Sequence, residues 1–129
     1  MEILLVAVSG LVIGWLLEFV YRSLERGNIT KPLFINEQMY VLTALFSYFL
    51  YTVEVRPIFV VLFLILFTTG VEFITGYLTL KLKCVRLWNY SKYPYNYKGI
   101  ICLEFSFVWL IMALAYYYFI LPFLVGYII

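Results

Sequence analysis

The chain has 129 residues, of which 66% are hydrophobic and 12% are charged, and its formal net charge is +2. Soluble domains carry about 25% charged residues, and the mean hydropathy of +1.02 likewise predicts a single integral membrane domain over residues 1–129. So small a net charge, carried by basic residues that flank apolar segments, argues against a nucleic-acid partner.

The acidic residues are all Glu, because the sequence contains neither His nor Asp. Catalytic Ser–His–Asp triads and His-rich metal sites are therefore excluded, and no G-x-x-x-x-G-K phosphate-binding loop occurs. Cys84 and Cys102 cannot form a metal site alone, and on the cytoplasmic side they are expected to stay reduced. We predict no metal, no cofactor and no catalytic residues, so an enzyme is the less favoured class.

Four apolar segments are predicted to cross the membrane as helices, for which about 20 residues usually suffice. The predicted spans cover residues 3–21, 39–53, 58–80 and 100–121. Gly27-Asn28 is expected to end the first helix, Pro57 to begin the third and Pro122 to close the fourth. The predicted fold is all-α and embedded in the membrane, with a structured cytoplasmic loop between the third and fourth helices.

The first span carries Gly10 and Gly14 in a G-x-x-x-G pattern, which lets a second helix approach closely. Glu18 continues the same face, since positions i, i+4 and i+8 share one side of a helix. Arg22 follows one turn later, in the favourable order for an ion pair. A structural ion pair at the membrane edge and a functional role for Glu18 both fit this spacing.

A polar stripe at three- and four-residue spacing runs along the third span and is expected to face protein rather than lipid. Its members are Thr68, Glu72, Thr75, Gly76 and Thr79. An intramembrane charge costs about 2.5–3.5 kcal/mol on insertion scales, so Glu72 must reach water, find a partner or hold a proton. We predict that Glu72, with Thr68 and Thr75, binds a ligand or carries a proton; the alternative is a structural role.

The stretch from Trp88 to Leu103 is a polar interruption with many aromatic and turn-forming residues. Its aromatic side chains suit a membrane interface, whereas the interleaved Asn, Ser, Pro and Gly favour an ordered loop. The predicted loop motif comprises Trp88, Asn89, Tyr90, Ser91, Pro94, Asn96, Gly99 and Cys102. Interfacial anchoring and a lid over a cytoplasmic cavity both fit this composition. Glu104 follows directly and is a further candidate for ligand binding.

The distribution of basic residues predicts the orientation in the membrane. Eight of the nine lie in the first and third connections: Arg22, Arg26, Lys31, Lys81, Lys83, Arg86, Lys92 and Lys98. Only Arg56 lies on the opposite side. By the positive-inside rule, both long loops are predicted to be cytoplasmic and both termini outside, in a multi-pass protein of the cell membrane.

A short internal similarity accompanies this topology. The first span contains Gly14-x-x-x-Glu18-Phe19, the third contains Gly70-x-Glu72-Phe73, and each is followed by a basic loop and another span. Two helix pairs in the same orientation predict a parallel repeat about an axis along the membrane normal, as in some transporters.

Several ordered motifs between residues 70 and 109 resemble a known family. They are Glu72-Phe73-Ile74-Thr75-Gly76-Tyr77-Leu78, Trp88-Asn89-Tyr90-Ser91, Pro94-x-Asn96-x-x-Gly99-x-x-Cys102-Leu103 and Phe105-Ser106-x-x-Trp109. Together with Glu18-Phe19, they resemble the bacterial membrane proteins of the Putative ABC-transporter type IV family. Asn89 departs from the Asp expected in the family, and the family's Asn-Arg-Gly-Phe-Leu pattern is not intact around Asn36. The resemblance implies four or more membrane helices and a transport role.

These features predict a transport-type component of unknown substrate that sits in the lipid bilayer as a homo-oligomer or with partner membrane subunits. Because the chain has no phosphate-binding loop, any ATPase that drives it must be a separate chain. A structural or assembly subunit is the first alternative. The second is a lipid-headgroup-binding protein or membrane enzyme, whose interfacial site would comprise Glu72, Glu104, Asn96, Tyr90 and Cys102.

Overall fold

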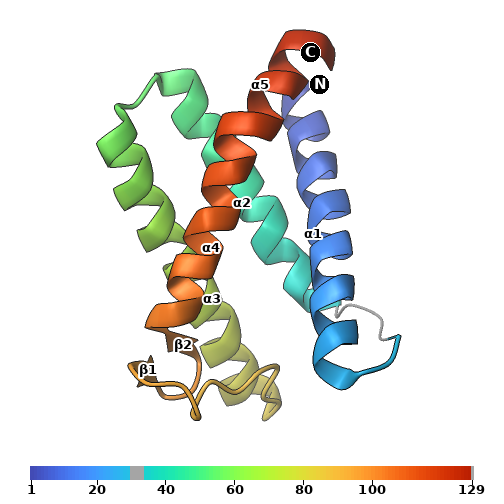
Figure 1. Ribbon diagram of the computed structural model, residues 1–129, viewed down its shortest axis with the longest axis vertical. Helices are drawn as coiled ribbons and strands as arrows, with labels where there is room; N and C mark the ends of the chain where they lie inside the picture. The colour runs from blue at the N-terminus through green and yellow to red at the C-terminus, as the bar shows by residue number, and fades with distance from the viewer. Residues whose placement is uncertain (30–33, 129) are drawn as a thin grey trace.

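The computed structural model describes residues 1–29 and 34–128 and is almost entirely helical (Figure 1). Its first three helices are α1 (Glu2–Arg26), α2 (Phe34–Val53) and α3 (Pro57–Lys83). The last helical segment comprises α4 (Leu103–Ala115), the π-helical η1 (Tyr116–Ile120), α5 (Leu121–Phe123) and the π-helical η2 (Leu124–Ile128). A two-stranded hairpin of β1 (Asn96–Tyr97) and β2 (Ile101–Cys102) precedes α4. The predicted all-helical fold is confirmed.

The helix ends follow the local turn chemistry of the sequence. Gly27 adopts a left-handed conformation with φ 74°, and its N–H donates to the Ser23 carbonyl at 2.9 Å, so α1 ends where predicted. Pro57 occupies the first turn of α3, where its missing N–H costs no helical hydrogen bond. Cys84 ends α3 in the left-handed region, with φ 55°.

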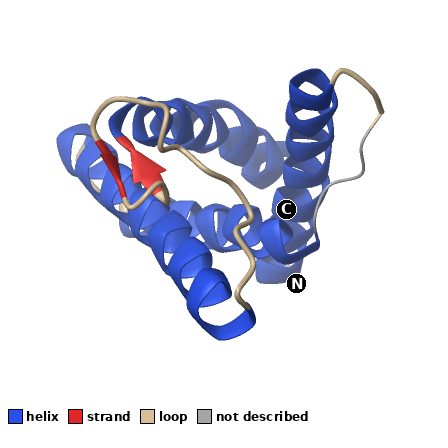
Figure 2. Cartoon of the chain, turned by 90° about the horizontal axis from the view of Figure 1, so that it is seen from below, coloured by secondary structure: helices blue, strands red, loops and turns tan. Residues whose placement is uncertain are grey.

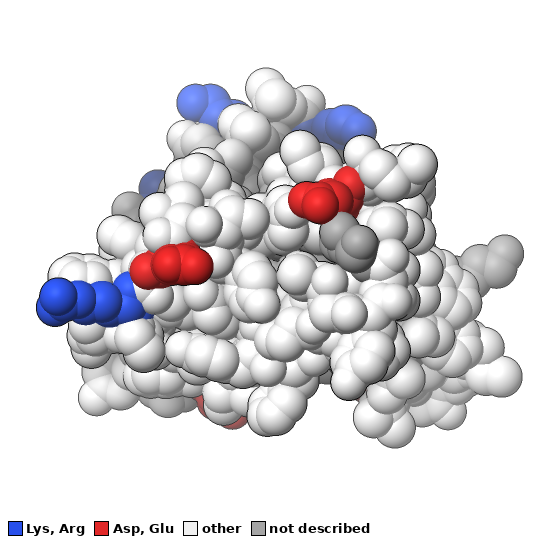
Figure 3. All heavy atoms as spheres, turned by 90° about the horizontal axis from the view of Figure 1, so that it is seen from above, with Lys and Arg blue, Asp and Glu red and all other residues white. Residues whose placement is uncertain are grey.

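The two chain termini lie together at one end of the molecule, whereas the loop between α3 and α4 lies at the other (Figure 1). Seen from the loop end, this connection arches across the helix ends (Figure 2). The terminal end is mostly uncharged, with few acidic and basic side chains (Figure 3). Helix α2 contacts α1, α3, α4 and η1, and is therefore the central element of the bundle.

Close packing of α1 on α2 depends on the predicted glycine pattern. A Cβ atom on Gly10 would come within 2.8 Å of the Ala44 Cβ, and one on Gly14 would overlap the Tyr40 side chain. Larger residues at these positions would force the helices apart. The face that carries Gly10 and Gly14 thus packs against α2, and Glu18 continues it.

The polar stripe of α3 faces the protein interior, as the sequence predicts. Thr68, Glu72, Gly76 and Thr79 are buried, and they continue the row that begins with Val60 and Leu64. The last two are fully buried in the apolar core beside α2 and α4. One face of α3 therefore changes from apolar to polar towards the loop end, and this change positions Glu72 where apolar packing gives way to hydrogen bonding.

The start of α2 differs from the predicted boundary. Helix α2 begins at Phe34 instead of residue 39, because polar residues assigned to the connection are helical and find partners. Gln38 Nε2, for example, donates to Thr75 Oγ1 at 2.7 Å. By length and composition, three helical segments are apolar enough to cross a membrane, namely Glu2–Arg26, Pro57–Lys83 and Leu103–Ile128. Helix α2, with its polar beginning, is not among them.

The last helix also departs from the prediction at both ends. It begins at Leu103 instead of residue 100, because residues 96–102 form the hairpin. Pro122 does not close it, since helical structure continues to Ile128. The preceding π-helical turn lets the Leu121 N–H donate to the Tyr116 carbonyl five residues back. In a regular α-helix, the proline ring clashes with the carbonyl four residues earlier. The wider π-helical turn changes the position of that carbonyl, so the helix continues through Pro122.

Candidate ligand-binding site

A cavity of about 530 Å³ lies at the loop end, bounded by α1, α2, α3, α4 and the loop before α4. Its walls include both intramembrane carboxyls named from the sequence, Glu18 and Glu72. The other polar or charged lining side chains are Tyr21, Arg22, Glu25, Arg26, Asn36, Tyr40, Trp88, Asn89, Tyr90, Lys92, Tyr93 and Trp109. Residues that are far apart in the sequence thus meet around one space.

Glu72 forms part of the inner wall of this cavity and is only 2% exposed. Its Oε2 accepts two hydrogen bonds, from the Tyr90 hydroxyl at 2.8 Å and from Trp109 Nε1 at 2.9 Å. Its Oε1 is buried and has no hydrogen-bond partner in the described part of the chain. One carboxyl oxygen is therefore saturated by the protein, while the other is buried and lacks a donor in the described part of the chain.

Glu18 has a different environment on the facing helix. Its Oε1 accepts from Asn36 Nδ2 at 2.9 Å, and its Oε2 accepts from the Tyr40 hydroxyl at 2.9 Å. Neutral donors of α2 therefore hold both oxygens, and the predicted ion pair with Arg22 is not what fixes this carboxyl. The physical reason is that α2 begins one turn earlier than predicted, which brings Asn36 within reach.

The two carboxyls have parallel settings in the two helix pairs. In each pair, the first helix supplies the Glu, and a nitrogen donor and a Tyr hydroxyl from the following segment donate to it. The rings of Tyr40 and Trp109, one donor from each pair, lie 5.0 Å apart between centroids. An aromatic contact therefore links the two carboxyl sites across the cavity.

Basic side chains line the same cavity nearer to its loop end. Arg22 and Arg26 come from the last turns of α1, and Lys92 comes from the loop. Arg22 is partly exposed, but its Nε is buried and lacks a hydrogen-bond partner among the described residues. Two residues of the cavity wall thus carry a buried polar atom without a partner in the described part of the chain, a donor on Arg22 and an acceptor on Glu72.

The loop is held in place mainly by its own polar residues. Trp88 Nε1 donates to the Ile100 carbonyl at 2.7 Å, and the Tyr90 N–H donates to the Gly99 carbonyl at 2.8 Å. Asn96 Nδ2 donates to the Tyr93 carbonyl at 2.8 Å, while its Oδ1 accepts from the Gly99 N–H at 3.0 Å. These bonds fix the loop as a frame that presents Tyr90 to Glu72.

Tyr90 is the loop residue that reaches deepest into the site. Its ring stacks on Phe105 of α4 with 4.6 Å between centroids and 9° between planes. Burial, and then the neighbouring Glu72 carboxylate, raise the pKa of Tyr90 well above its usual range. The hydroxyl therefore stays protonated and serves as a permanent donor.

Asn89 and Gly99 explain one departure from the family pattern. Asn89 Oδ1 accepts from the backbone N–H of Ser91 at 3.0 Å and from its hydroxyl at 2.6 Å. An Asp oxygen could accept the same two bonds, so Asn retains this turn. Gly99 has φ 69°, and a Cβ there would approach Asn89 Oδ1 to 2.8 Å. Both residues hold the loop in shape, and Asn89 also lines the cavity.

The remaining predicted site residues lie outside the lining. Thr68 Oγ1 donates to the Leu64 carbonyl of its own helix at 2.8 Å, and Thr75 accepts from Gln38. Glu104 is exposed in the first turn of α4, and Pro94 is exposed on the loop. Cys102 is a buried free thiol whose pKa is raised by burial. No group of metal-ligating side chains suited to an ion occurs within residues 1–29 and 34–128.

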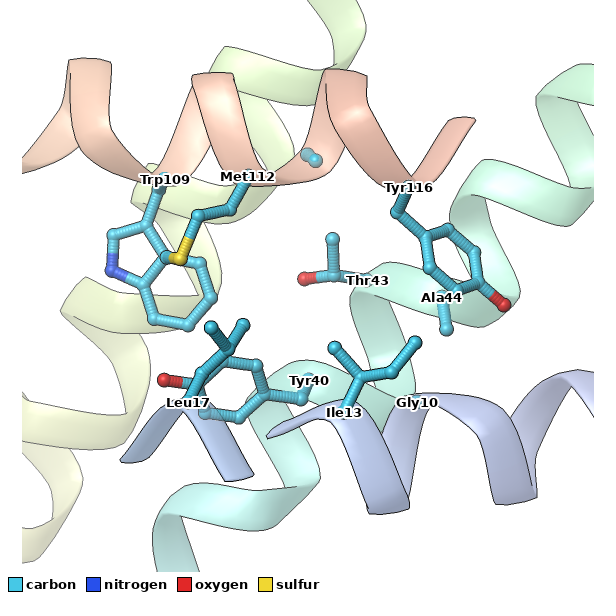
Figure 4. Close-up of a pocket in the computed structure, with 10 residues that line it drawn as sticks. Gly10, Ile13, Leu17, Tyr40, Thr43, Ala44, Trp109, Met112 and Tyr116 are labelled. Carbon is cyan, nitrogen blue, oxygen red and sulfur yellow. The ribbon is translucent and has the colours of Figure 1, made fainter. Parts of the chain in front are cut away.

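A smaller apolar cavity of about 50 Å³ adjoins the site (Figure 4). Leu17, Tyr40, Trp109 and Met112 line both cavities. Figure 4 shows Trp109 and Met112 pointing from α4 towards Leu17 of α1. The polar site therefore continues into apolar space between α1, α2 and α4.

Comparison with protein-family models gives a match over most of the chain. The model described as Putative ABC-transporter type IV matches residues 5–129. The chain belongs to this family. The match extends the resemblance found over residues 70–109 to nearly the whole sequence. The searches of curated proteins and of solved structures give no match. The family name suggests a transport-related membrane protein, and both Glu18 and Glu72 fall within the matched region.

Sequence reasoning missed Asn36 and Tyr40, the two residues that hold Glu18. Their i, i+4 spacing at the start of α2 was the available signal, since it puts both side chains on one face. Trp109 was noted only as part of a family motif, although its indole N–H is the second donor to Glu72. A buried Trp needs a partner for this N–H, which could have pointed to a carboxyl.

Proposed function

We propose that this chain is a transport-type component whose substrate binds in the 530 Å³ cavity, with Glu72 as the binding or proton-coupling group. The observation that carries the proposal is the free Oε1 of Glu72, which is buried and unpartnered in the described part of the chain. A buried acceptor without a partner is costly to the protein, about 1–3 kcal/mol. An unpartnered carboxyl oxygen beside a cavity is explained if a ligand donates a hydrogen bond to it or if it carries a proton.

A four-span topology fits this function. Helix α2 has 20 residues, long enough at about 1.5 Å per residue to cross the hydrocarbon core. With α2 as the fourth span, both termini lie on one side, in keeping with their common end in Figure 1. The positive-inside rule then makes the loop end cytoplasmic. Replacing Lys92 by Cys should permit labelling from the cytoplasm only, and labelling from outside would contradict this orientation.

Transport also requires a route from the cavity to the opposite side of the membrane. The apolar core of Val6, Leu64 and Leu121 is fully buried and fills the bundle beyond the site. We therefore propose that the chain acts as a homo-oligomer or with partner membrane subunits, and that any ATPase is a separate chain.

A structural role for the carboxyls is the second candidate. Glu18 joins α1 to α2, and Glu72 joins α3 to both the loop and α4 through hydrogen bonds. Such buried polar bonds can lock helices together in a membrane. A structural role does not explain why Oε1 of Glu72 lacks a partner in the described part of the chain. It predicts that loss of either carboxyl lowers the stability of the protein or alters its oligomeric state.

Glu72→Gln separates the two functions. Because both donors meet the same oxygen, the Gln carbonyl can accept both bonds, and its NH₂ takes the place of the free Oε1. We expect normal expression and oligomer size. Membrane vesicles from producing cells, incubated with a small-molecule cell extract, should accumulate solutes that Glu72→Gln vesicles do not. Identical vesicle contents by mass spectrometry would contradict the transport proposal, and an altered oligomer would support the structural one.

A further inference from the structure

The unsatisfied polar atoms of the cavity form a complementary set. Glu72 Oε1 and Asn36 Oδ1 are buried acceptors, and Arg22 Nε is a buried donor; none has a partner among the described residues. All three residues line the same cavity. Two acceptors and a cationic donor on residues that line one cavity match a zwitterion that carries both N–H groups and an anion.

We propose that the cavity binds the headgroup of a phospholipid with a primary ammonium, of the phosphatidylethanolamine class. This inference rests on the proposed function, because it names the ligand class of the same site. The ammonium would lie against Glu72 and Asn36, the phosphate against Arg22, and the acyl chains would leave between α1 and α4.

The inner wall favours an ammonium with N–H groups. Glu72 and Asn36 are each 2% exposed, and their free oxygens can be satisfied only by donors. Tyr40, Tyr90 and Trp109 surround the same region, and aromatic faces attract a cation. A trimethylated ammonium could lie on the rings, but it would leave both acceptors without hydrogen bonds.

The outer part of the site favours a phosphate. Arg22 is more exposed than Glu72 and lies one turn nearer to the loop end than Glu18. Lys92 and Arg26 also line the cavity, and together with Arg22 these basic side chains outnumber the neighbouring Glu25. A guanidinium donates well to phosphate oxygens, and basic side chains at this depth attract lipid headgroups.

An opening to the bilayer is provided between α1 and α4. Leu17, Val20 and Val108 line the cavity, yet they are 39%, 52% and 40% exposed. Exposed apolar side chains at the mouth of a polar cavity suit acyl chains better than water. The neighbouring 50 Å³ apolar cavity, which shares Leu17 and Trp109 with the site, continues this apolar surface.

The test is native mass spectrometry of the full chain in detergent, titrated with phospholipids that have identical acyl chains. Phosphatidylethanolamine should bind at least tenfold more tightly than phosphatidylcholine, which lacks N–H groups, and than phosphatidylglycerol, which lacks the cation. Glu72→Gln should abolish this preference. Arg22→Gln should weaken the binding of phosphatidylethanolamine at least fivefold. Glu54→Gln is the matched control, since Glu54 is exposed at the turn between α2 and α3, and it should change nothing.

Equal binding of the three lipids by the unmodified protein would overturn the inference without recourse to any variant. Equally tight binding of soluble phosphoethanolamine would overturn the bilayer as the source of the ligand. If the lipid preference is absent but vesicle contents still depend on Glu72, this inference fails and the proposed function stands. If the lipid binds as expected but neither vesicle contents nor the distribution of phosphatidylethanolamine between the two leaflets depends on Glu72, the lipid site stands and the proposed function fails.

Discussion

The two helix pairs of this protein each contain a Glu side chain, but the hydrogen bonds to the two carboxyls differ. In the first pair, both oxygens of Glu18 are occupied, each by one donor from α2. In the second, the two donors converge on one oxygen of Glu72, and the other oxygen remains free. Carboxyls that look equivalent in the sequence therefore differ in what they offer to a ligand.

The difference arises from where the donors lie in the chain. Asn36 and Tyr40 are one turn apart on α2, so their side chains reach Glu18 at different positions along the helix axis and donate to separate oxygens. Tyr90 comes from the loop and Trp109 from α4, so they approach Glu72 from two elements. Donors on one helix thus occupy both oxygens of Glu18, whereas donors from the loop and α4 meet on one oxygen of Glu72.

Replacement of each carboxyl by Leu should have the largest effect and should be similar in the two pairs. Glu72→Leu leaves the Tyr90 hydroxyl and the Trp109 N–H buried without an acceptor, and each orphaned donor costs about 1–3 kcal/mol. Glu18→Leu does the same to Asn36 and Tyr40. Unfolding in mixed micelles would measure the loss, and a stable Glu72→Leu protein would contradict these hydrogen bonds.

Removal of the Tyr40 hydroxyl should give Glu18 a free oxygen, as Glu72 has in the second pair. Tyr40→Phe frees Oε2 of Glu18, and Tyr90→Phe leaves Glu72 held by Trp109 alone. Each change should cost about 1.5–3 kcal/mol, the usual value for a hydrogen bond to a charged group. Carbodiimide modification followed by peptide mass spectrometry should increase at Glu18 in Tyr40→Phe. Unchanged modification of Glu18 would show that saturation does not protect this carboxyl.

The smallest effect is expected at the position that departs from the family pattern. Asn89→Asp keeps the acceptor for Ser91 and should change the free energy of unfolding by less than about 0.5 kcal/mol. Asn89→Ala removes both bonds and should cost about 1 kcal/mol, with faster proteolysis of the loop. Equal behaviour of the two variants would mean that this turn does not hold the loop.

The sequence predicted the helical elements well because local chemistry decides them. Gly27 and Pro57 mark ends that depend only on backbone preference, and the α3 stripe follows from helical periodicity. The start of α2 was misplaced because polar Asn36 and Gln38 look like a connection until their partners on α1 and α3 are known. Continuation through Pro122 depends on a π-helical turn, for which the sequence offers no clear signal.

The candidate site could be predicted in part. Glu72 was predicted as a site residue because it lies deep within an apolar span. The loop was predicted to be ordered because it contains many aromatic and turn-forming residues. The convergence of Tyr90 and Trp109 on one oxygen could not be deduced, because it depends on how the loop frame and α4 meet in space. The predicted Glu18–Arg22 pair followed from spacing on one helix, but donors from α2 took its place.

The most direct test of the free Glu72 oxygen compares Glu72→Gln with Glu18→Gln in one set of vesicle and unfolding measurements. Gln at 72 can keep both donors, whereas Gln at 18 forces one of its two contacts to reverse direction. We predict that Glu72→Gln abolishes Glu72-dependent accumulation while its free energy of unfolding stays within about 1 kcal/mol of the unmodified protein. Glu18→Gln should be the less stable variant and should retain accumulation. Full accumulation in Glu72→Gln, or its failure to fold while Glu18→Gln folds normally, would contradict the account.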